Sequence, residues 1–175
     1  VFYEKPVIKF ERLLQTYIKT WPFGLKSFCA AMISLFGKKF WIEHVIRKET
    51  GFTGEILYTK HHHAHAASAY YCSDFEDAVV VTIDGVGEWD TALIAHGNKN
   101  NLIDKKTIGF PDSLGLLYSA VTYYLGFKVN SGEYKVMGLA PYGDASVYYE
   151  KMKALLDYKE DGSYKLNQKY FSYQY

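Results

Sequence analysis

Four of the six histidines lie within five consecutive positions, in the segment HHHAH at residues 61–65. Residues four apart share one face of a helix, with Cβ atoms about 6 Å apart, so His61 and His65 can hold one metal ion together. His62 and His63 point about 100° and 200° away around the helix and cannot join them. Two ligands do not complete a site, so a third ligand, best a carboxylate, must come from elsewhere.

The same histidine spacing occurs in zinc-protease helices, but that motif has a Glu directly after the first histidine. Here the residue after His61 is His62, which disfavours a metalloprotease. A purification tag is also disfavoured, because Ala64 interrupts the run and well-formed elements flank it. The remaining alternative is a set of solvent-facing polar residues at the start of a helix.

A second segment, TIDGVGEWDT, places Asp84 at the end of an apolar strand, followed by Gly85 and Gly87. Glycines at such a turn let backbone N–H groups approach a phosphate closely, and a carboxylate at a strand end can hold a metal or a water. The segment is neither a Walker A loop nor a Rossmann fingerprint. The alternative is an ordinary hairpin turn.

A third segment, SGEYKVMGLAPYG, contains Lys135, Gly138 and Gly143. Lys135 can contact a phosphate or a ribose, and the two glycines suggest a close approach of the backbone to a ligand. The alternative is a loop and a short helical turn with a solvated lysine.

Taken together and in this order, HHHAHAASAYY, IDGVGEWDT and SGEYKVMGLAPYG resemble the nodulation-type carbamoyltransferase family. Its members O-carbamoylate nodulation factors, cephalosporins and aminoglycosides such as tobramycin. The opening VFYEKPVIKFERLL is also similar to this family, so the resemblance covers about residues 1–143.

The resemblance implies an amino-terminal transferase domain of the actin-like, sugar-kinase-like (ribonuclease-H-like) ATPase fold. It also implies a second, smaller domain that forms carbamoyl-adenylate from carbamoyl phosphate and ATP, after which the first domain moves the carbamoyl group to a hydroxyl acceptor. The family's divalent metal, often iron, is held by two histidines, which match His61 and His65, and by one later aspartate. We expect that aspartate to lie outside this chain.

The other family roles carry over by position. Asp84, Gly85 and Gly87 match the phosphate-side turn, whose backbone N–H groups would hold the phosphate. Lys135 and Gly138 match the nucleotide-side loop. For the base that removes the acceptor proton, His62 is a candidate by its proximity alone.

The elements that must position these residues follow an α/β order with a mixed sheet and flanking helices. The apolar, β-branched run at 77–85 predicts a buried strand. Asp112 or Ser113 is the expected cap of the helix that follows the sheet, and Gly126 its stop. We expect strands at 1–5, 54–60, 77–85 and on both sides of the turn at 97–100, and helices within 7–21, 25–51, 61–71, 111–127 and 145–157, with a poorly defined tail.

The polar segment at 72–77 is a candidate boundary. We interpret residues 1–73 as part of the first α/β subdomain of the transferase domain and 74–175 as the start of the second. The adenylate-forming carboxy-terminal domain is then absent, and this slice alone should not catalyse the complete reaction. The absence of the family's first strands should expose a sheet edge that can pair with another copy.

Composition limits the partners. Hydrophobic residues make up 49% and charged residues 22%, ordinary values for a soluble globular protein. A net charge of +1 argues against a broad surface for nucleic acid or anionic lipid. No apolar run approaches the roughly 18 to 20 residues of a membrane helix. With two cysteines and no signal peptide, we expect a cytoplasmic protein with reduced thiols.

Two other functions share parts of the pattern. A sugar kinase or other ATPase of the same fold would use the glycine turn but has no role for the histidine pair. A non-catalytic binding module would carry the histidines as surface polar groups. The hydroxyl acceptor, the identity of the metal and the oligomeric state are not determined by the sequence.

Overall fold

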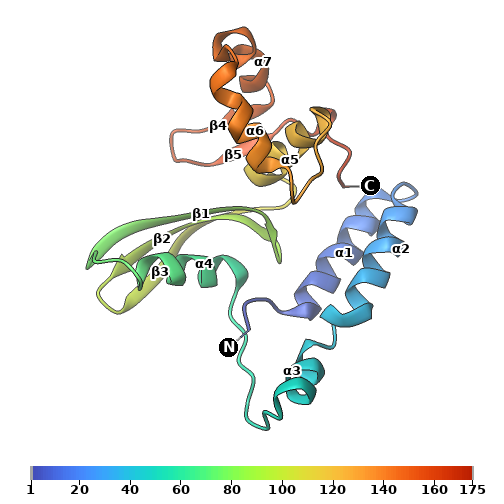
Figure 1. The fold of residues 1–175 in the computed structure, drawn as a ribbon, viewed down its shortest axis with the longest axis vertical. Helices are drawn as coiled ribbons and strands as arrows, with labels where there is room; N and C mark the ends of the chain where they lie inside the picture. The colour runs from blue at the N-terminus through green and yellow to red at the C-terminus, as the bar shows by residue number, and fades with distance from the viewer. Residues whose placement is uncertain (1, 175) are drawn as a thin grey trace.

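The computed structural model describes residues 2–174, which form helices and two small antiparallel sheets (Figure 1). The helices are α1 (Pro6–Thr20), α2 (Leu25–Ser34), α3 (Ile42–Thr50), α4 (His61–Tyr70), α5 (Leu114–Tyr124), α6 (Glu133–Leu139) and α7 (Tyr149–Lys153), with a π-helical segment at Leu35–Lys39 and 3-10 turns at Ala140–Tyr142, Ala145–Val147 and Gln168–Tyr170. The strands are β1 (Asp77–Gly87), β2 (Asp90–Asn98), β3 (Asn101–Gly109), β4 (Leu156–Tyr158) and β5 (Tyr164–Leu166).

The helix boundaries follow local sequence signals. Pro6 occupies the first turn of α1, where its missing N–H costs nothing. Gly51 ends α3 in the left-handed conformation, with φ of 67°. Of the two expected caps for α5, Ser113 is the one used: its hydroxyl accepts a hydrogen bond from the N–H of Leu116. Gly126, with φ of 82°, follows the end of that helix as predicted.

The central sheet is an antiparallel meander in the order β1-β2-β3. Its first turn lies at Glu88 and Trp89, since Gly87 still pairs with Asp90. The regular register stops at Ile83 and resumes at Gly87, so the three residues between them form a bulge. This bulge, rather than a hairpin turn, holds the first glycine of the DGVG segment.

Helix α4 covers one face of this sheet (Figure 1). Ala66 and Tyr70 of the helix are buried against Val80, Leu93 and Ala95 of the strands. This core contains residues from both sides of the boundary that the sequence suggested near residue 74. The packing therefore fixes the start of α4 relative to β1.

Several expectations about strands were wrong. Within the described residues, the strands expected at 1–5 and 54–60 are reduced to one isolated parallel bridge between Phe2 and Tyr58, and the sheet itself is antiparallel rather than mixed. β1 is buried on only one face, because Val79, Val81 and Ile83 are 72%, 57% and 56% exposed. The β-branched run predicted the strand correctly, but burial of its second face requires a layer that residues 2–174 do not supply.

The carboxy-terminal third also differs from the expectation. The helix predicted for 145–157 is a 3-10 turn followed by the short α7, and the supposedly undefined tail contains the β4–β5 hairpin. Thr122 is the fully buried residue of α5, whereas Leu125, just after the helix, is 49% exposed. No helix in the described part of the chain is long and apolar enough to cross a membrane.

Candidate metal centre

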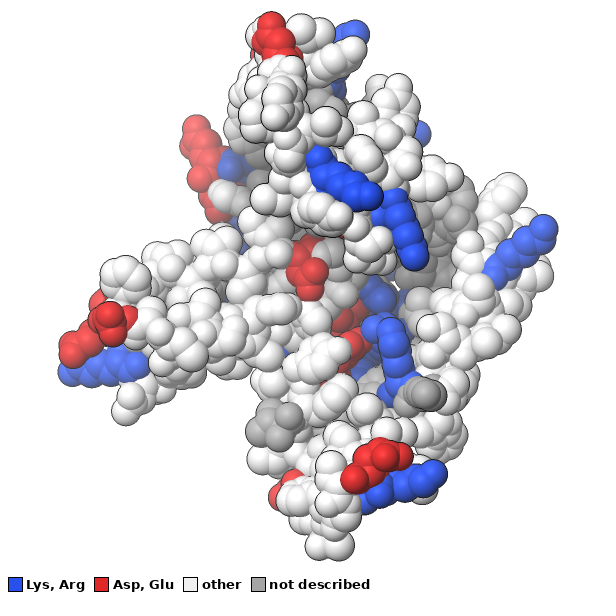
Figure 2. Space-filling view, in the orientation of Figure 1, with Lys and Arg blue, Asp and Glu red and all other residues white. Residues whose placement is uncertain are grey.

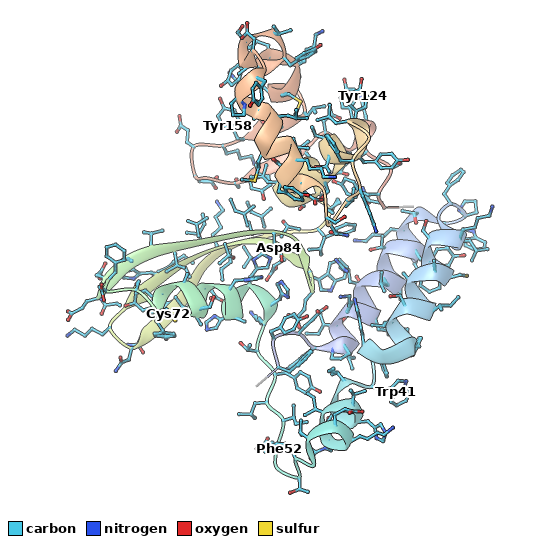
Figure 3. All side chains as sticks on the ribbon, viewed as in Figure 1. Trp41, Phe52, Cys72, Asp84, Tyr124 and Tyr158 are labelled. Carbon is cyan, nitrogen blue, oxygen red and sulfur yellow. The ribbon has the colours of Figure 1, made fainter. Side chains whose placement is uncertain are left out.

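The first turn of α4 and the bulge of β1 bring three potential metal ligands together. Nε2 of His61 lies 2.8 Å from Oδ2 of Asp84 and 3.0 Å from Nε2 of His65. Nε2 of His65 lies 3.5 Å from the same carboxylate oxygen. Figure 3 shows Asp84 at the end of the sheet that faces the beginning of α4. The structure therefore confirms that the i, i+4 histidines share one face, and adds a carboxylate to them.

The spacing of these three atoms fits a metal ion. Two ligands about 2.1 Å from a common ion, at an angle between 90° and 109°, lie about 3.0 to 3.4 Å apart. The observed separations of 2.8, 3.0 and 3.5 Å are close to that range. Two imidazoles and a carboxylate also form a donor set that suits iron, zinc and similar ions.

The carboxylate of Asp84 is held in one orientation. Its Oδ1 accepts a hydrogen bond from the N–H of Gly85 at 2.6 Å, which leaves Oδ2 turned toward the histidines. Burial raises the pKa of Asp84, but the hydrogen bonds from Gly85 and His61 outweigh it, and the net pKa is lowered. The side chain is therefore an anion at neutral pH, as a metal ligand must be. The N–H of Gly85, expected to bind a phosphate, is already used by this carboxylate.

Gly87 is a glycine because His61 lies directly against it. A Cβ at this position would lie 2.3 Å from Cδ2 of His61 and 2.8 Å from its Cβ. The sequence reasoning explained this glycine by phosphate binding, whereas the structure explains it by contact with a metal-ligand candidate. Tyr3 covers another side of the same imidazole, with ring centroids 5.3 Å apart.

Sequence reasoning missed two residues that shape the bulge. The fully buried hydroxyl of Ser113 lies 3.0 Å from the carbonyl oxygen of Asp84 and 2.6 Å from that of Gly85. A Cβ on Gly115 would lie 2.4 Å from the carbonyl oxygen of Asp84, so only glycine allows α5 to approach this closely. Ser113 was recognised as a cap, but nothing in the sequence indicated that the same hydroxyl also binds the strand that carries Asp84.

The other two histidines of the cluster point away from the candidate centre. His62 is 2% exposed, and its Nδ1 and Nε2 lie 2.7 Å from the hydroxyl of Thr82 and 3.0 Å from the carbonyl oxygen of Asp90. Because a carbonyl only accepts, Nε2 carries the hydrogen and Nδ1 accepts from Thr82. Burial lowers the pKa of His62 below its ordinary value, although the bond to the Asp90 carbonyl raises it. A buried imidazole with both nitrogens engaged is suited to locking α4 on the sheet, not to taking a proton from a substrate.

His63 contacts Asp104 of β3, at 3.0 Å between Nδ1 and Oδ1. It therefore also contributes to the attachment of α4, on the side opposite the metal-ligand candidates.

The comparison with known proteins agrees with the three motifs. The sequence profile of the family described as Carbamoyltransferase N-terminus matches residues 1–175. The chain belongs to the carbamoyltransferase family.

Relatives of this carbamoyltransferase chain include an uncharacterised protein and two nodulation proteins. The uncharacterised protein sll1178 of Synechocystis is 49% identical over 181 residues, covering 99% of this chain and 29% of that protein. The nodulation protein NolNO of Sinorhizobium fredii is 39% identical over 63% of the chain and 16% of its own length. The nodulation protein NolO of Bradyrhizobium diazoefficiens is 39% identical over 61% of the chain and 19% of its own length. The chain thus spans less than a third of these relatives.

The two residues predicted to lie on the nucleotide side, Lys135 and Gly138, are in α6. Lys135 is exposed, and its Nζ lies 5.9 Å from the ring centroid of Phe127. Gly138 is exposed, and a Cβ there would have no atom within 4 Å. The structure does not bring these two residues to His61 and Asp84, and their role toward a nucleotide stays a prediction.

Proposed function

We propose that this chain is part of an O-carbamoyltransferase that moves a carbamoyl group from carbamoyl-adenylate to a hydroxyl acceptor. The carbamoyl-adenylate would form from carbamoyl phosphate and ATP in another part of the protein. The observation that carries the proposal is the convergence of His61, His65 and Asp84 on one point. Membership of the carbamoyltransferase family supports the reaction class.

The chain's own residues perform three tasks in this proposal. His61 and His65 supply two imidazole nitrogens, and Asp84 supplies one anionic oxygen whose direction is fixed by Gly85. Ser113 holds the backbone of the bulge, so the carboxylate keeps its position as substrates enter and leave. A divalent metal bound there would act as a Lewis acid toward a phosphate or carbamoyl oxygen. His65, 53% exposed at its side chain, leaves this centre open to solvent and substrate.

Metal content of the intact protein tests the site. We expect His65→Ala and Asp84→Asn each to lower the affinity for a divalent ion at least about 10- to 100-fold, and carbamoyl transfer to fall with it. His44→Ala is the matched control, because His44 is an exposed histidine on α3. A His65→Ala protein with full metal content and full transfer activity would refute the site.

The reaction class needs a separate assay. ATP–pyrophosphate exchange that depends on carbamoyl phosphate would establish carbamoyl-adenylate formation by the intact protein. ATP consumption without exchange, and with phosphoryl transfer to an alcohol, would favour the kinase-like ATPase instead. A protein without either activity and without bound metal would match the non-catalytic module.

The actin-like fold, ATP as a cofactor, iron as the metal and a cytoplasmic location belong to the same proposal. A division of the chain into two subdomains near residue 74 belongs to it as well, although α4 shares its core with β1 and β2. β1 and β3 are both edge strands of this sheet within the described residues. Pairing of such an edge with a second copy is open to test by measuring the mass in solution.

A further inference from the structure

A cavity of about 260 Å³ lies between α1, α2, the segment that links the sheet to α5, and the end of the described chain. Figure 1 shows the chain returning to the α1–α2 helices at its carboxy-terminal end. The residues that define its character are Arg12, Tyr17, Phe28, Val86, Phe110 and Tyr173. The lining thus includes four aromatic rings and one cation, beside aliphatic, small and uncharged polar side chains.

Flat aromatic surfaces are already ordered on two sides of this cavity. Tyr17 of α1 stacks on Phe28 of α2, with ring centroids 4.4 Å apart and an angle of 11° between the planes. On the other side, Phe110 and Tyr173 are in contact, with centroids 6.2 Å apart. The hydroxyl of Tyr173 donates to the carbonyl oxygen of Pro111 at 2.8 Å, so this ring is held in place.

Arg12 is the unusual group in this cavity. Its guanidinium carbon lies 5.6 Å from the ring centroid of Phe110. Its Nε is buried and has no hydrogen-bond partner within residues 2–174. Burial lowers the pKa of Arg12, and the charge of Glu4 raises it by a smaller amount. The carboxylate of Glu4 forms its ion pair with Lys9, at 2.6 Å.

Arg12 is partly buried, and burial of its Nε without a hydrogen-bond partner is costly, because this part of the charged group loses hydration and gains nothing in return. None of the ion pairs in the described part of the chain includes Arg12. The planar guanidinium matches the two oxygens of a carboxylate or phosphate. An anion in the cavity would therefore supply the charge partner that the guanidinium of Arg12 lacks among the described residues.

The volume of the cavity limits the size of the ligand. An apolar cavity of about 150 Å³ holds benzene in a protein interior. The 260 Å³ found here leaves room for a ring and an anionic group. The four aromatic rings in the lining favour a flat apolar body over a fully hydrated one.

We propose that this cavity binds a small organic anion, whose acidic group pairs with the guanidinium of Arg12 and whose flat apolar body lies among the aromatic rings. This inference goes beyond carbamoyl transfer and does not depend on it. Val86, which lies between Gly85 and Gly87, forms part of the wall. A bound molecule therefore lies against the strand that carries Asp84.

Calorimetric titration of the intact protein without added metal or ATP tests this site. The probes are benzoate, its uncharged isostere benzamide, inorganic phosphate and carbamoyl phosphate. We expect benzoate to bind about tenfold or more tightly than benzamide, the minimum for a hydrogen bond to a charged group. Tighter binding of benzoate than of the phosphates assigns a carboxylate ligand, and the reverse order assigns a phosphate ligand.

Variants then place the binding in this cavity. Arg12→Met keeps the aliphatic stem and should weaken binding of the preferred anion about tenfold or more. Gln15→Met, on an exposed position of the same helix, should leave it unchanged. Equal binding of benzoate and benzamide, no binding of any of the four probes, or unchanged anion binding by Arg12→Met would each overturn the proposal. The benzoate and benzamide comparison uses the unaltered protein, so it decides the question even where Arg12→Met fails to fold.

Discussion

Replacement of Gly87 by alanine is the sharpest test of the geometry around the candidate metal centre. The new methyl group would lie 2.3 Å from Cδ2, 2.6 Å from Cγ and 2.8 Å from Cβ of His61. Carbon atoms in contact lie about 3.5 to 4.0 Å apart. Since Cβ of His61 is itself too close, rotation of the imidazole alone cannot remove the overlap.

The size of the displacement follows from these distances. To restore a contact of 3.5 Å, the Cβ of His61 must move by about 0.7 Å and the nearest ring atom by about 1.2 Å. In a metal site, the distance from the ion to a ligand atom stays within about 0.2 Å of its usual value. Nε2 of His61 is therefore expected to leave the centre, and metal affinity to fall at least about 100-fold, the upper range for loss of a supporting residue.

The assay is metal content and Co²⁺ titration of the intact Gly87→Ala protein, next to its thermal unfolding. Gly37→Ala is the matched control, because a Cβ at Gly37 would meet no atom within 4 Å. We expect the control to bind metal normally. Overpacking at Gly87 should lower the free energy of unfolding by about 1 to 3 kcal/mol, so the protein should remain folded at room temperature.

Unchanged metal affinity in Gly87→Ala, with a folded protein, would show that His61 does not lie against Gly87 while the metal is bound. It would then refute the assignment of His61 as a ligand in this geometry. Loss of metal in both Gly87→Ala and Gly37→Ala would instead indicate a general loss of structure, and the control is included to detect it.

Three further changes follow from the packing around the bulge. Burial lowers the pKa of His62, so this histidine takes up a proton in the unfolded chain below about pH 6.5 but not yet in the folded one. The unfolding temperature should therefore fall as the pH drops below that value. The His62→Gln variant should show a weaker pH dependence. Ser113→Ala removes a helix cap and the contacts of its hydroxyl with two carbonyl oxygens of the bulge. It should lower the free energy of unfolding, measured by denaturant titration, by about 1 to 3 kcal/mol. A decrease of less than about 0.5 kcal/mol would contradict this role. Gly115→Ala places a methyl 2.4 Å from the carbonyl oxygen of Asp84, so both stability and metal content should fall, and normal metal content would show that α5 does not press on the bulge.

Local signals in the sequence were reliable where local chemistry decides the outcome. The end of α3 at Gly51 needs only a residue that tolerates positive φ, and the start of α5 needs only a side chain such as Ser113 that accepts a backbone hydrogen bond. The pairing of His61 with His65 also follows from helix periodicity alone. These predictions held because each involves residues within one helical turn.

Predictions that required distant partners were less complete. The alternation of exposed and buried residues in β1 depends on which layers cover the sheet, and residues 2–174 supply α4 on one face only. Among the described residues, the strands expected before α1 and after α3 are not present, because a strand is stable only with a partner along its length and Phe2 pairs with Tyr58 alone.

The sequence by itself determined the family, the histidine pair and the residue types that surround it. It left open whether Asp84 would serve a phosphate, a metal or a water. Only the tertiary structure shows that Asp84 lies beside the histidine pair. Packing of α4 on the sheet brings Oδ2 of Asp84 to within 2.8 Å of Nε2 of His61, which is 23 positions away in the sequence. Gly87 and Gly115 show the same dependence: each reads as a turn or helix glycine in sequence, yet its necessity comes from an atom of another element that lies where its side chain would be.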